Sequence, residues 1–369
     1  MMPKENLSLI QLLTLTINFL IGSSIVVGVG LQAKNDAWIA LAAGTMAGFA
    51  IVWFYHKISD LVPEKNIYQI FEYVYGKKIT ILLSLLYVTY FVYLASRVVR
   101  DFIELISASI MPHTPIEFIS LTLMLLMGYI IYLGIEVLAR ITEIFTPYIL
   151  GFFVLLGIFL IASGTIDIQN IKPVLSGGVF PVAKVVFPSI ITFPFGELIA
   201  FLIIFPAITK RNHSLKFSLI GVGIAGGLLT LSSLLTITTL GTDITQRSAF
   251  PLLSVARLVS VGEFIERMDS VVVFIMMLGI LIKGAVFLFS ATKGLEHIFN
   301  LPYRYFAVPL AMIVSLFSIL VSVNFADHVE EGLTLVPKFL HLPFQFGVPG
   351  ITMVIILWKK RKQIKKRKR

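Results

Sequence analysis

Phe193-Pro194-Phe195-Gly196-Glu197 is the stretch that decides the fold, because it places a proline, a glycine and an acid inside a long apolar segment. The segment covers residues 185–209, and a helix needs about 20 apolar residues to cross a bilayer. Proline removes a backbone donor and clashes with the preceding turn, whereas glycine tolerates the freed backbone angles. An acid at mid-depth is costly and usually faces the bundle interior or a wet cavity. The pattern therefore predicts a broken membrane helix with a polar group at the break.

Similar apolar segments recur along the whole chain. The sequence has 369 residues, of which 57% are hydrophobic and 14% charged, whereas soluble domains carry about 25% charged residues. We therefore expect an all-α polytopic membrane protein, with a single transmembrane domain over residues 1–358 and about ten membrane-spanning helices. Spans 1 to 10 are predicted at 6–33, 37–55, 79 to beyond 100, 118–135, 144–166, 185–209, 217–242, 270–292, 305–326 and 339–358.

The tail Lys359–Arg369 carries nine cations in eleven residues. A basic run directly after a membrane span indicates a cytoplasmic end that lies on anionic lipid headgroups. Nucleic acid is the weaker alternative partner, because the run is tethered to a membrane and has no aromatic platform. With the N-terminus inside, 20 of the 30 Lys and Arg residues fall in cytoplasmic segments, 9 in external ones and Lys283 within a span. Both termini are therefore predicted to be cytoplasmic.

The ten predicted spans divide into two sets of five that match each other. Many transporters consist of two inverted repeats, with the substrate site where one helix of each half is broken. Repeat one would cover about residues 7–166 and repeat two about 185–358, so that span 1 corresponds to span 6. Span 1 carries Gly22-Ser23-Ser24 in its middle, which predicts the second break. Spans 2 and 7 share a motif that allows close helix packing, Gly44-xxx-Gly48 in span 2 and Gly223-xxx-Gly227 in span 7. Each of these spans is followed by a predicted short amphipathic helix, at Asn66–Tyr75 and at Pro251–Met268.

Glu197 and Lys283 are the two charged residues predicted at mid-depth. Glu197 would accept hydrogen bonds from backbone donors freed by the break, or take up a proton; an acid with a purely structural role is the alternative. Lys283 lies too deep in span 8 to reach the interface easily. Sodium-coupled proteins of the five-plus-five fold hold a cation between spans 1 and 8, so we hypothesise that the Lys283 ammonium replaces that ion, paired with Glu197 or with span 1 carbonyls. A shifted span 8, with Lys283 near an interface, is the alternative.

Two further sets of residues are candidates for binding a ligand. Gly22, Ser23 and Ser24 would offer amides and hydroxyls to a carboxylate, as broken helix ends do for anions. A glycine that only permits close packing is the alternative. Tyr90, one of three regularly spaced tyrosines in span 3, would close a pocket with its ring and hydroxyl, although aromatic residues in spans more often face lipid or the interface.

The outer end of span 3 carries four charged residues. Their spacing permits ion pairs of Arg97 with Asp101 and of Arg100 with Glu104, each four residues apart on one helix face. We expect a solvated helix end here, and a vestibule that reads ligand charge is the alternative.

Several classes of function are excluded by what the sequence lacks. It has no cysteine, which excludes disulfides, thiolate nucleophiles and cysteine-ligated metals. Gly221–Gly226 matches the dinucleotide pattern GxGxxG, but it lies inside a block of 26 uncharged residues rather than between a strand and a helix. The sequence has neither a P-loop nor HExxH, and its six histidines are scattered. We therefore expect neither an enzyme nor a bound metal or cofactor.

Some of these stretches resemble a known family. Leu7-Ser8-Leu9-Ile10-Gln11, the Gly22-Ser23 break and the stretch Phe193–Glu197 followed by Phe205-Pro206 are similar to the endospore germination permease family, the GerAB-like B subunits of spore germinant receptors. The resemblance covers essentially the whole chain. It implies membership of the amino acid–polyamine–organocation superfamily, and with it the LeuT-like five-plus-five inverted-repeat fold with broken helices 1 and 6.

The resemblance also implies a role and a site. Such a B subunit lies in the inner membrane of the dormant spore with an A subunit and a lipoprotein C subunit, and it binds a nutrient such as an amino acid or a sugar to trigger germination. The pocket would be lined by Gly22, Ser23 and Ser24 from span 1 and by Phe193, Phe195 and Gly196 from span 6, with spans 3 and 8 as walls. One alternative is a permease that moves an amino acid with a proton on Glu197. Another is a structural subunit with a vestigial pocket.

Overall fold

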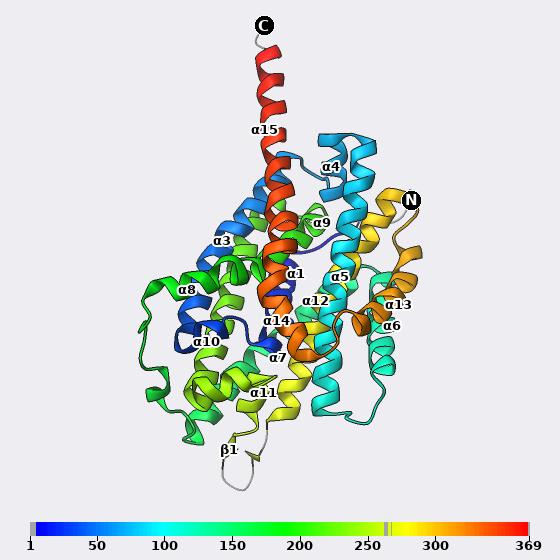
Figure 1. The fold of residues 1–369 in the computed structure, drawn as a ribbon. Helices are drawn as coiled ribbons and strands as arrows, with labels where there is room; N and C mark the ends of the chain where they lie inside the picture. The colour runs from blue at the N-terminus through cyan, green and yellow to red at the C-terminus, as the bar shows by residue number, and fades with distance from the viewer. Residues whose placement is uncertain (1–4, 262–264, 267, 368–369) are drawn as a thin grey trace.

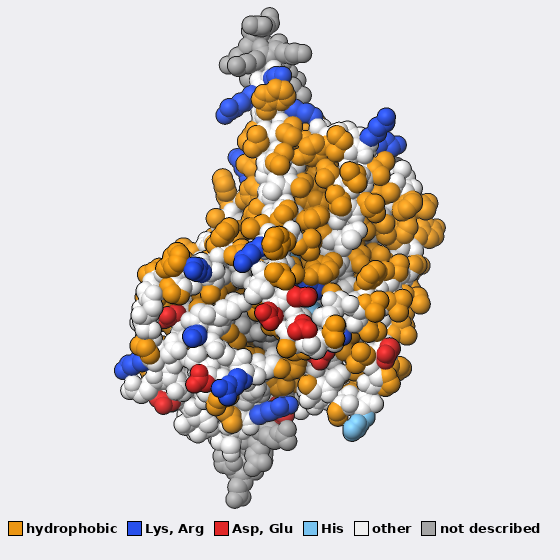
Figure 2. Space-filling view, in the orientation of Figure 1, with side chains coloured by type: hydrophobic (Ala, Val, Ile, Leu, Met, Phe, Trp, Pro, Cys, Tyr) orange, Lys and Arg blue, Asp and Glu red, His pale blue; other side chains and the backbone are white. Residues whose placement is uncertain are grey.

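The computed structural model describes residues 5–261, 265–266 and 268–367, and it is a helical bundle with one small hairpin (Figure 1). Among these residues, nine helical segments are long and apolar enough to cross a membrane, and the shorter apolar helix α13 (Arg304–Leu320) follows the eighth of them. This arrangement confirms the predicted all-α membrane fold with about ten spans. On the side drawn in Figure 2, hydrophobic side chains cover much of the upper and right-hand surface, as expected for a face in lipid.

The first half of the chain forms the first five spans. Its elements are α1 (Leu9–Ile21), α2 (Ser24–Val27), η1 (Leu31–Asp36), α3 (Ala37–Leu61), α4 (Ile67–Tyr75), α5 (Lys77–Ser109), α6 (Ile116–Leu133) and α7 (Ile135–Ala162). Spans 2 and 5 are longer than predicted, because charged residues such as Lys57 and Arg140 continue their helices beyond the apolar stretch.

The second half is more irregular. Its first elements are η2 (Ile168–Ile171), α8 (Val179–Val185), η3 (Val186–Ile190), η4 (Phe195–Ala200), α9 (Phe201–Ile204), η5 (Phe205–Ala207), η6 (Arg211–His213) and α10 (Ser214–Arg247). They are followed by α11 (Pro251–Ala256), β1 (Ser260–Val261), β2 (Ile265–Glu266), α12 (Asp269–Phe299), α13, α14 (Phe325–Val336), η7 (Pro337–Gly347) and α15 (Val348–Arg367). The predicted GxGxxG decoy lies inside α10, as its uncharged surroundings indicated.

Spans 1 and 6 are both broken, as predicted. Helix α1 begins with a capping box between Ser8 and Gln11 and ends at Gly22, whose non-helical backbone turns the chain before α2. In span 6 the helical chain stops at Phe193–Pro194 and resumes as the tighter η4. The proline and the glycines therefore act where their backbone chemistry indicated.

The glycines of spans 2 and 7 pack against the broken helices. A methyl group on Gly48 of α3 would lie 2.5 Å from the Phe195 ring, and one on Gly221 of α10 would lie 2.9 Å from Thr16 of α1. The prediction for span 7 was wrong in detail, because Gly227 has open space around it. The closest contacts of α10 are made instead by Gly221 with α1 and by Gly226 with Thr45 of α3.

Of the two predicted amphipathic connectors, the first is confirmed and the second is mostly wrong. The first is α4, which buries its apolar face. The second was predicted over Pro251–Met268, but its helix α11 ends at Ala256. The chain then becomes extended, and Val259, directly before β1, is buried. Strand β1 pairs with β2 in an antiparallel hairpin. Residues 262–264 and 267 lie outside the described part of the chain.

The two ends of the described chain lie beside α4. Glu5 lies in the same surface hollow as Asn66 and Gln69 at the start of α4. Lys359 of α15 donates hydrogen bonds to the carbonyl oxygens of Tyr73 and Val74 near the end of α4, at 3.2 and 2.8 Å. The described part of the chain therefore begins and ends at one end of the bundle, while β1 lies at the opposite end (Figure 1).

Candidate functional site

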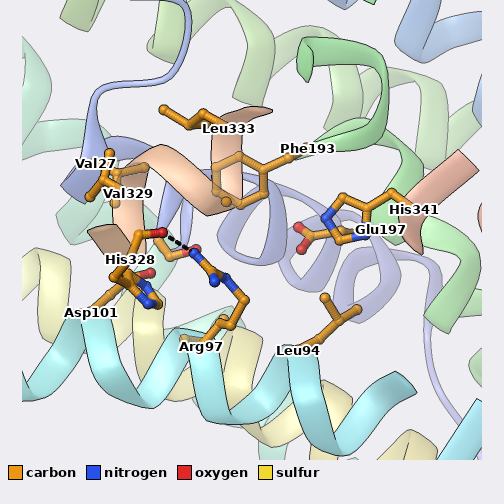
Figure 3. A pocket seen from close by; sticks show the side chains of 13 residues that line it. Val27, Leu94, Arg97, Asp101, Phe193, Glu197, His328, Val329, Leu333 and His341 are labelled. Carbon is orange, nitrogen blue, oxygen red and sulfur yellow. Dashed lines mark hydrogen bonds and ion pairs between the residues drawn. The ribbon is translucent and has the colours of Figure 1, made fainter. Parts of the chain in front are cut away.

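A small cavity lies where the two broken helices meet, and helices α5 and α14 close it from the other sides (Figure 3). Ser23 from the first break and Phe193 and Glu197 from the second line it. Its volume is about 40 Å³, room for only a few water molecules at about 10–15 Å³ each. Ser23 and Glu197 are almost inaccessible from solvent, whereas Phe193 on the same cavity is partly exposed.

An ion pair joins the second break to span 8. The Lys283 ammonium lies 2.6 Å from Oε2 of Glu197, and the two side chains are 0% and 3% exposed. Neither of these atoms has another polar partner among the described residues. The lysine lies in the middle of α12 and is fully buried in the bundle. Because each charge is buried and depends on the other, removal of one partner leaves an uncompensated charge in a buried site.

The same lysine passes directly along the first break. A methyl group on Gly22 would lie 2.7 Å from Lys283 Cδ, so only glycine leaves room for the lysine stem. The ammonium also lies 4.3 Å from the centre of the Phe193 ring and 5.6 Å from that of Phe19, positions that favour a cation over an aromatic face. Lys283 therefore contacts both breaks at once.

The other predicted site residues lie around the cavity rather than on it. Phe195 packs its ring on Gly48, and Ser24 is fully buried with no partner for its hydroxyl among the described residues. The carbonyl of Gly196 accepts a hydrogen bond from the Tyr55 hydroxyl at 2.8 Å. These side chains support the breaks, whereas Ser23, Phe193 and Glu197 face the space between them.

Tyr90 lies one layer behind the cavity wall. Its hydroxyl is 3.0 Å from Nδ1 of His341 and accepts a hydrogen bond from the Gln345 side chain at 2.9 Å. His341 itself lines the cavity. Tyr90 thus orients the histidine instead of closing the pocket with its own ring.

The expectation of a solvated end for span 3 was wrong. Arg97 and Asp101 are only 9% and 4% exposed, and both line the cavity. The Arg100–Glu104 pair forms as predicted, at 2.7 Å. Asp101, however, pairs with His328 of α14 at 3.0 Å, and Arg97 donates a hydrogen bond to the His328 carbonyl. Helix α14 covers this part of α5, and no local pattern in span 3 indicates that cover.

His328 and His341 are the site residues that sequence reasoning missed. They come from α14 and from η7, the wide π-helical stretch in the last span. The available signal was a pair of prolines, Pro337 and Pro343, which interrupt the last apolar segment as Pro194 interrupts span 6. Irregular helical turns of this kind are frequent at functional sites.

Comparisons with known proteins agree with this architecture. Residues 6–325 match the family model described as spore germination protein. Spore germination protein KB of Bacillus subtilis (strain 168) is 35% identical over 367 residues, which cover 99% of this chain and 98% of that protein. Spore germination protein YndE of the same strain is 23% identical over 97% of this chain and 98% of that protein.

A solved structure has the same fold. Mhp1, a nucleobase-cation-symport-1 family transporter in a closed conformation with bromovinylhydantoin bound, superposes with a TM-score of 0.62 at 12% identity. The match covers 95% of this chain and 78% of Mhp1. At this identity the likeness concerns the fold alone, and it agrees with the five-plus-five arrangement of spans.

Proposed function

The chain belongs to the spore germination protein family, and from that premise we propose that it is the nutrient-binding membrane subunit of a spore germinant receptor. It is a multi-pass integral membrane protein with a transporter fold, which supports a role in nutrient sensing or transport rather than in catalysis. The proposed ligand is a small amino acid or a sugar, bound between the breaks of spans 1 and 6.

The observation that carries this proposal is the small polar cavity between the two breaks. It combines a hydroxyl (Ser23), an aromatic ring (Phe193) and charged groups (Arg97, Asp101 and Glu197) around one space. Since about 40 Å³ holds only a few waters, a nutrient has to enter a wider state of the same site. A ligand that binds the wider state better shifts the equilibrium toward it, and that shift is the signal. We propose that an A subunit and a lipoprotein C subunit read it in the inner membrane of the spore.

Within this mechanism, Lys283 is the resident cation of the site. Its ammonium contacts both breaks and balances Glu197, which supports our hypothesis that no separate coupling ion is needed there. During gating, the Lys283–Glu197 pair would stay intact while the segments around it move. Gly22, Ser24, Phe195, Gly196 and Tyr90 hold the surrounding backbone and side chains in position.

A proton-coupled amino acid permease is the second candidate, because Glu197 faces the cavity and would be its proton carrier. In that case Glu197 has to exchange its bond to Lys283 for a proton in each cycle. The 2.6 Å separation of the pair favours the sensor, whose Glu197 keeps its partner.

Two assays test the proposal. Spores with and without this gene are exposed to a panel of amino acids and sugars, and the proposal expects one nutrient response to disappear with the gene. The Phe193→Ala variant should lose the same response at normal protein level. An unchanged response across the panel contradicts the sensor. Concentrative uptake of that nutrient by the purified chain in liposomes would instead establish the permease.

A further inference from the structure

The ligand cavity adjoins a larger space and shares three apolar lining residues with it. A vestibule of about 690 Å³ lies next to it, toward the end of the bundle that carries β1, and is lined by residues such as Gln32, Arg247 and Glu330. Three residues line both spaces, namely Val27, Val329 and Leu333. These three side chains lie where the two spaces meet.

Helix α14 supplies two of the three shared residues, and its apolar packing is concentrated at its ends, at Phe325 and Val336. Only His328 and Val336 are buried among its twelve residues. Its acidic residues face outward, and acidic side chains gather beside a hollow on this face of the molecule (Figure 2). A segment with few buried apolar contacts opens at lower cost than the core around it.

Polar contacts to neighbouring spans hold α14 in place instead. Asp101 of α5 lies 3.0 Å from the His328 ring, and the Ser189 hydroxyl donates to the Leu333 carbonyl at 2.8 Å. Arg97 donates to the His328 carbonyl, and its charged group lies 4.0 Å from Glu331. The side chains of Arg97, Asp101 and His328 converge under α14 (Figure 3).

Gly332 lets the Arg97 guanidinium lie directly on the α14 backbone. A methyl group at this position would lie 3.1 Å from Arg97 Cζ and closer still to Nη2. A side chain at position 332 therefore requires the guanidinium to move off the α14 backbone. Arg97 is also part of the cavity lining, so one side chain contacts both the ligand space and α14.

We propose that α14 is a lid over the ligand cavity and that Arg97 is the positioning residue that holds it closed. The proposal rests on the proposed function only in taking this cavity as the ligand site. A ligand oxygen that reaches the guanidinium competes with the His328 carbonyl for the same donors. Ligand binding therefore changes how firmly α14 is held, and α14 carries that change to the surface of the protein.

Thiol labelling tests the lid, because the chain has no native cysteine. Ser23→Cys places a thiol in the cavity, and Gln32→Cys places one in the vestibule as a freely reactive control. The purified proteins in detergent are treated with a polar maleimide. Ser23→Cys should react slowly on its own and about tenfold faster with Arg97→Ala, since a hydrogen bond from a charged donor is lost from the closed state.

Two further variants make the result decisive. Arg100→Ala is the matched control, because Arg100 is equally buried on the same helix but contacts Glu104 and α13 rather than α14. It should leave Ser23→Cys slow. Gly332→Ala keeps every charge and should accelerate labelling like Arg97→Ala, so it carries the test if Arg97→Ala does not fold.

Equal labelling rates with and without Arg97→Ala and Gly332→Ala would overturn the lid, and so would a Ser23→Cys that reacts as fast as Gln32→Cys. Because no ligand is present in this assay, either result would leave the nutrient-binding proposal untouched. Loss of the nutrient response in Phe193→Ala spores tests that proposal separately.

Discussion

The buried ion pair between Lys283 and Glu197 allows a quantitative test of the site. Lys283→Met keeps the length of the side chain but removes the ammonium from a position that is fully inaccessible to solvent. Glu197 is then left with an uncompensated charge, which costs about 3–5 kcal/mol when a buried pair is broken by removing one partner. Glu197→Gln leaves Lys283 in the same situation. We expect each single variant to lower the free energy of unfolding by an amount in this range.

The double variant Lys283→Met/Glu197→Gln removes both charges together. Its loss of unfolding free energy should be far smaller than the sum of the two single losses, because residues in direct contact do not act additively. We expect a coupling energy of about 3 kcal/mol or more. The assay is unfolding of the purified protein by increasing mole fractions of sodium dodecyl sulfate, analysed as a double-mutant cycle. Lys293 and Glu296 of α12 form the control pair, and because this pair is partly exposed its coupling should be about 0–1 kcal/mol.

A coupling below about 1 kcal/mol for Lys283 and Glu197 would refute the reasoning, since that is the range of solvent-exposed pairs. The ion-replacement hypothesis has its own refutation. If Lys283 is the resident cation, Lys283→Met should lose ligand binding. Retained ligand binding at normal protein levels would show that the ammonium is not needed at the breaks.

The structure makes three other predictions. Gly22→Ala should destabilise the protein by about 1–3 kcal/mol through overpacking, because its methyl group meets Lys283 Cδ at 2.7 Å. Gly227→Ala is the control, because its methyl group has open space and the variant should be neutral or stabilising. The same detergent unfolding measures both. Burial raises the pKa of Tyr303, whose hydroxyl also donates to a carboxylate near the N-terminus at 2.6 Å. The stability that a raised pKa contributes is fully present below the unfolded value of about 10 and is lost as the pH rises above it. In a series of melting temperatures above pH 10, a Tyr303→Phe variant should therefore lose stability less steeply than the parent. Deletion of residues 360–369 should abolish any increase in melting temperature that anionic lipid gives over neutral lipid, and in the full chain that increase should shrink as salt is added.

The sequence by itself determined the membrane environment, the number of spans and the two breaks. Hydropathy, proline and glycine act through the local backbone, so Gly22 and Pro194 mark the breaks without knowledge of any partner. The sequence also placed Glu197 and Lys283 at mid-depth, because a charge in a long apolar block is conspicuous wherever it later points. These properties are local, and the structure agrees with each of them.

Only the tertiary structure decided which side chains face the cavity. Arg97 and His328 meet although they are 231 residues apart, and their contact turns an expected solvated helix end into a cavity wall. Likewise Tyr90 lies behind His341, which enters from an irregular turn of the last span. The direction of a side chain in a bundle depends on which helix covers it, and that cover is set by packing between distant segments rather than by the pattern around the residue.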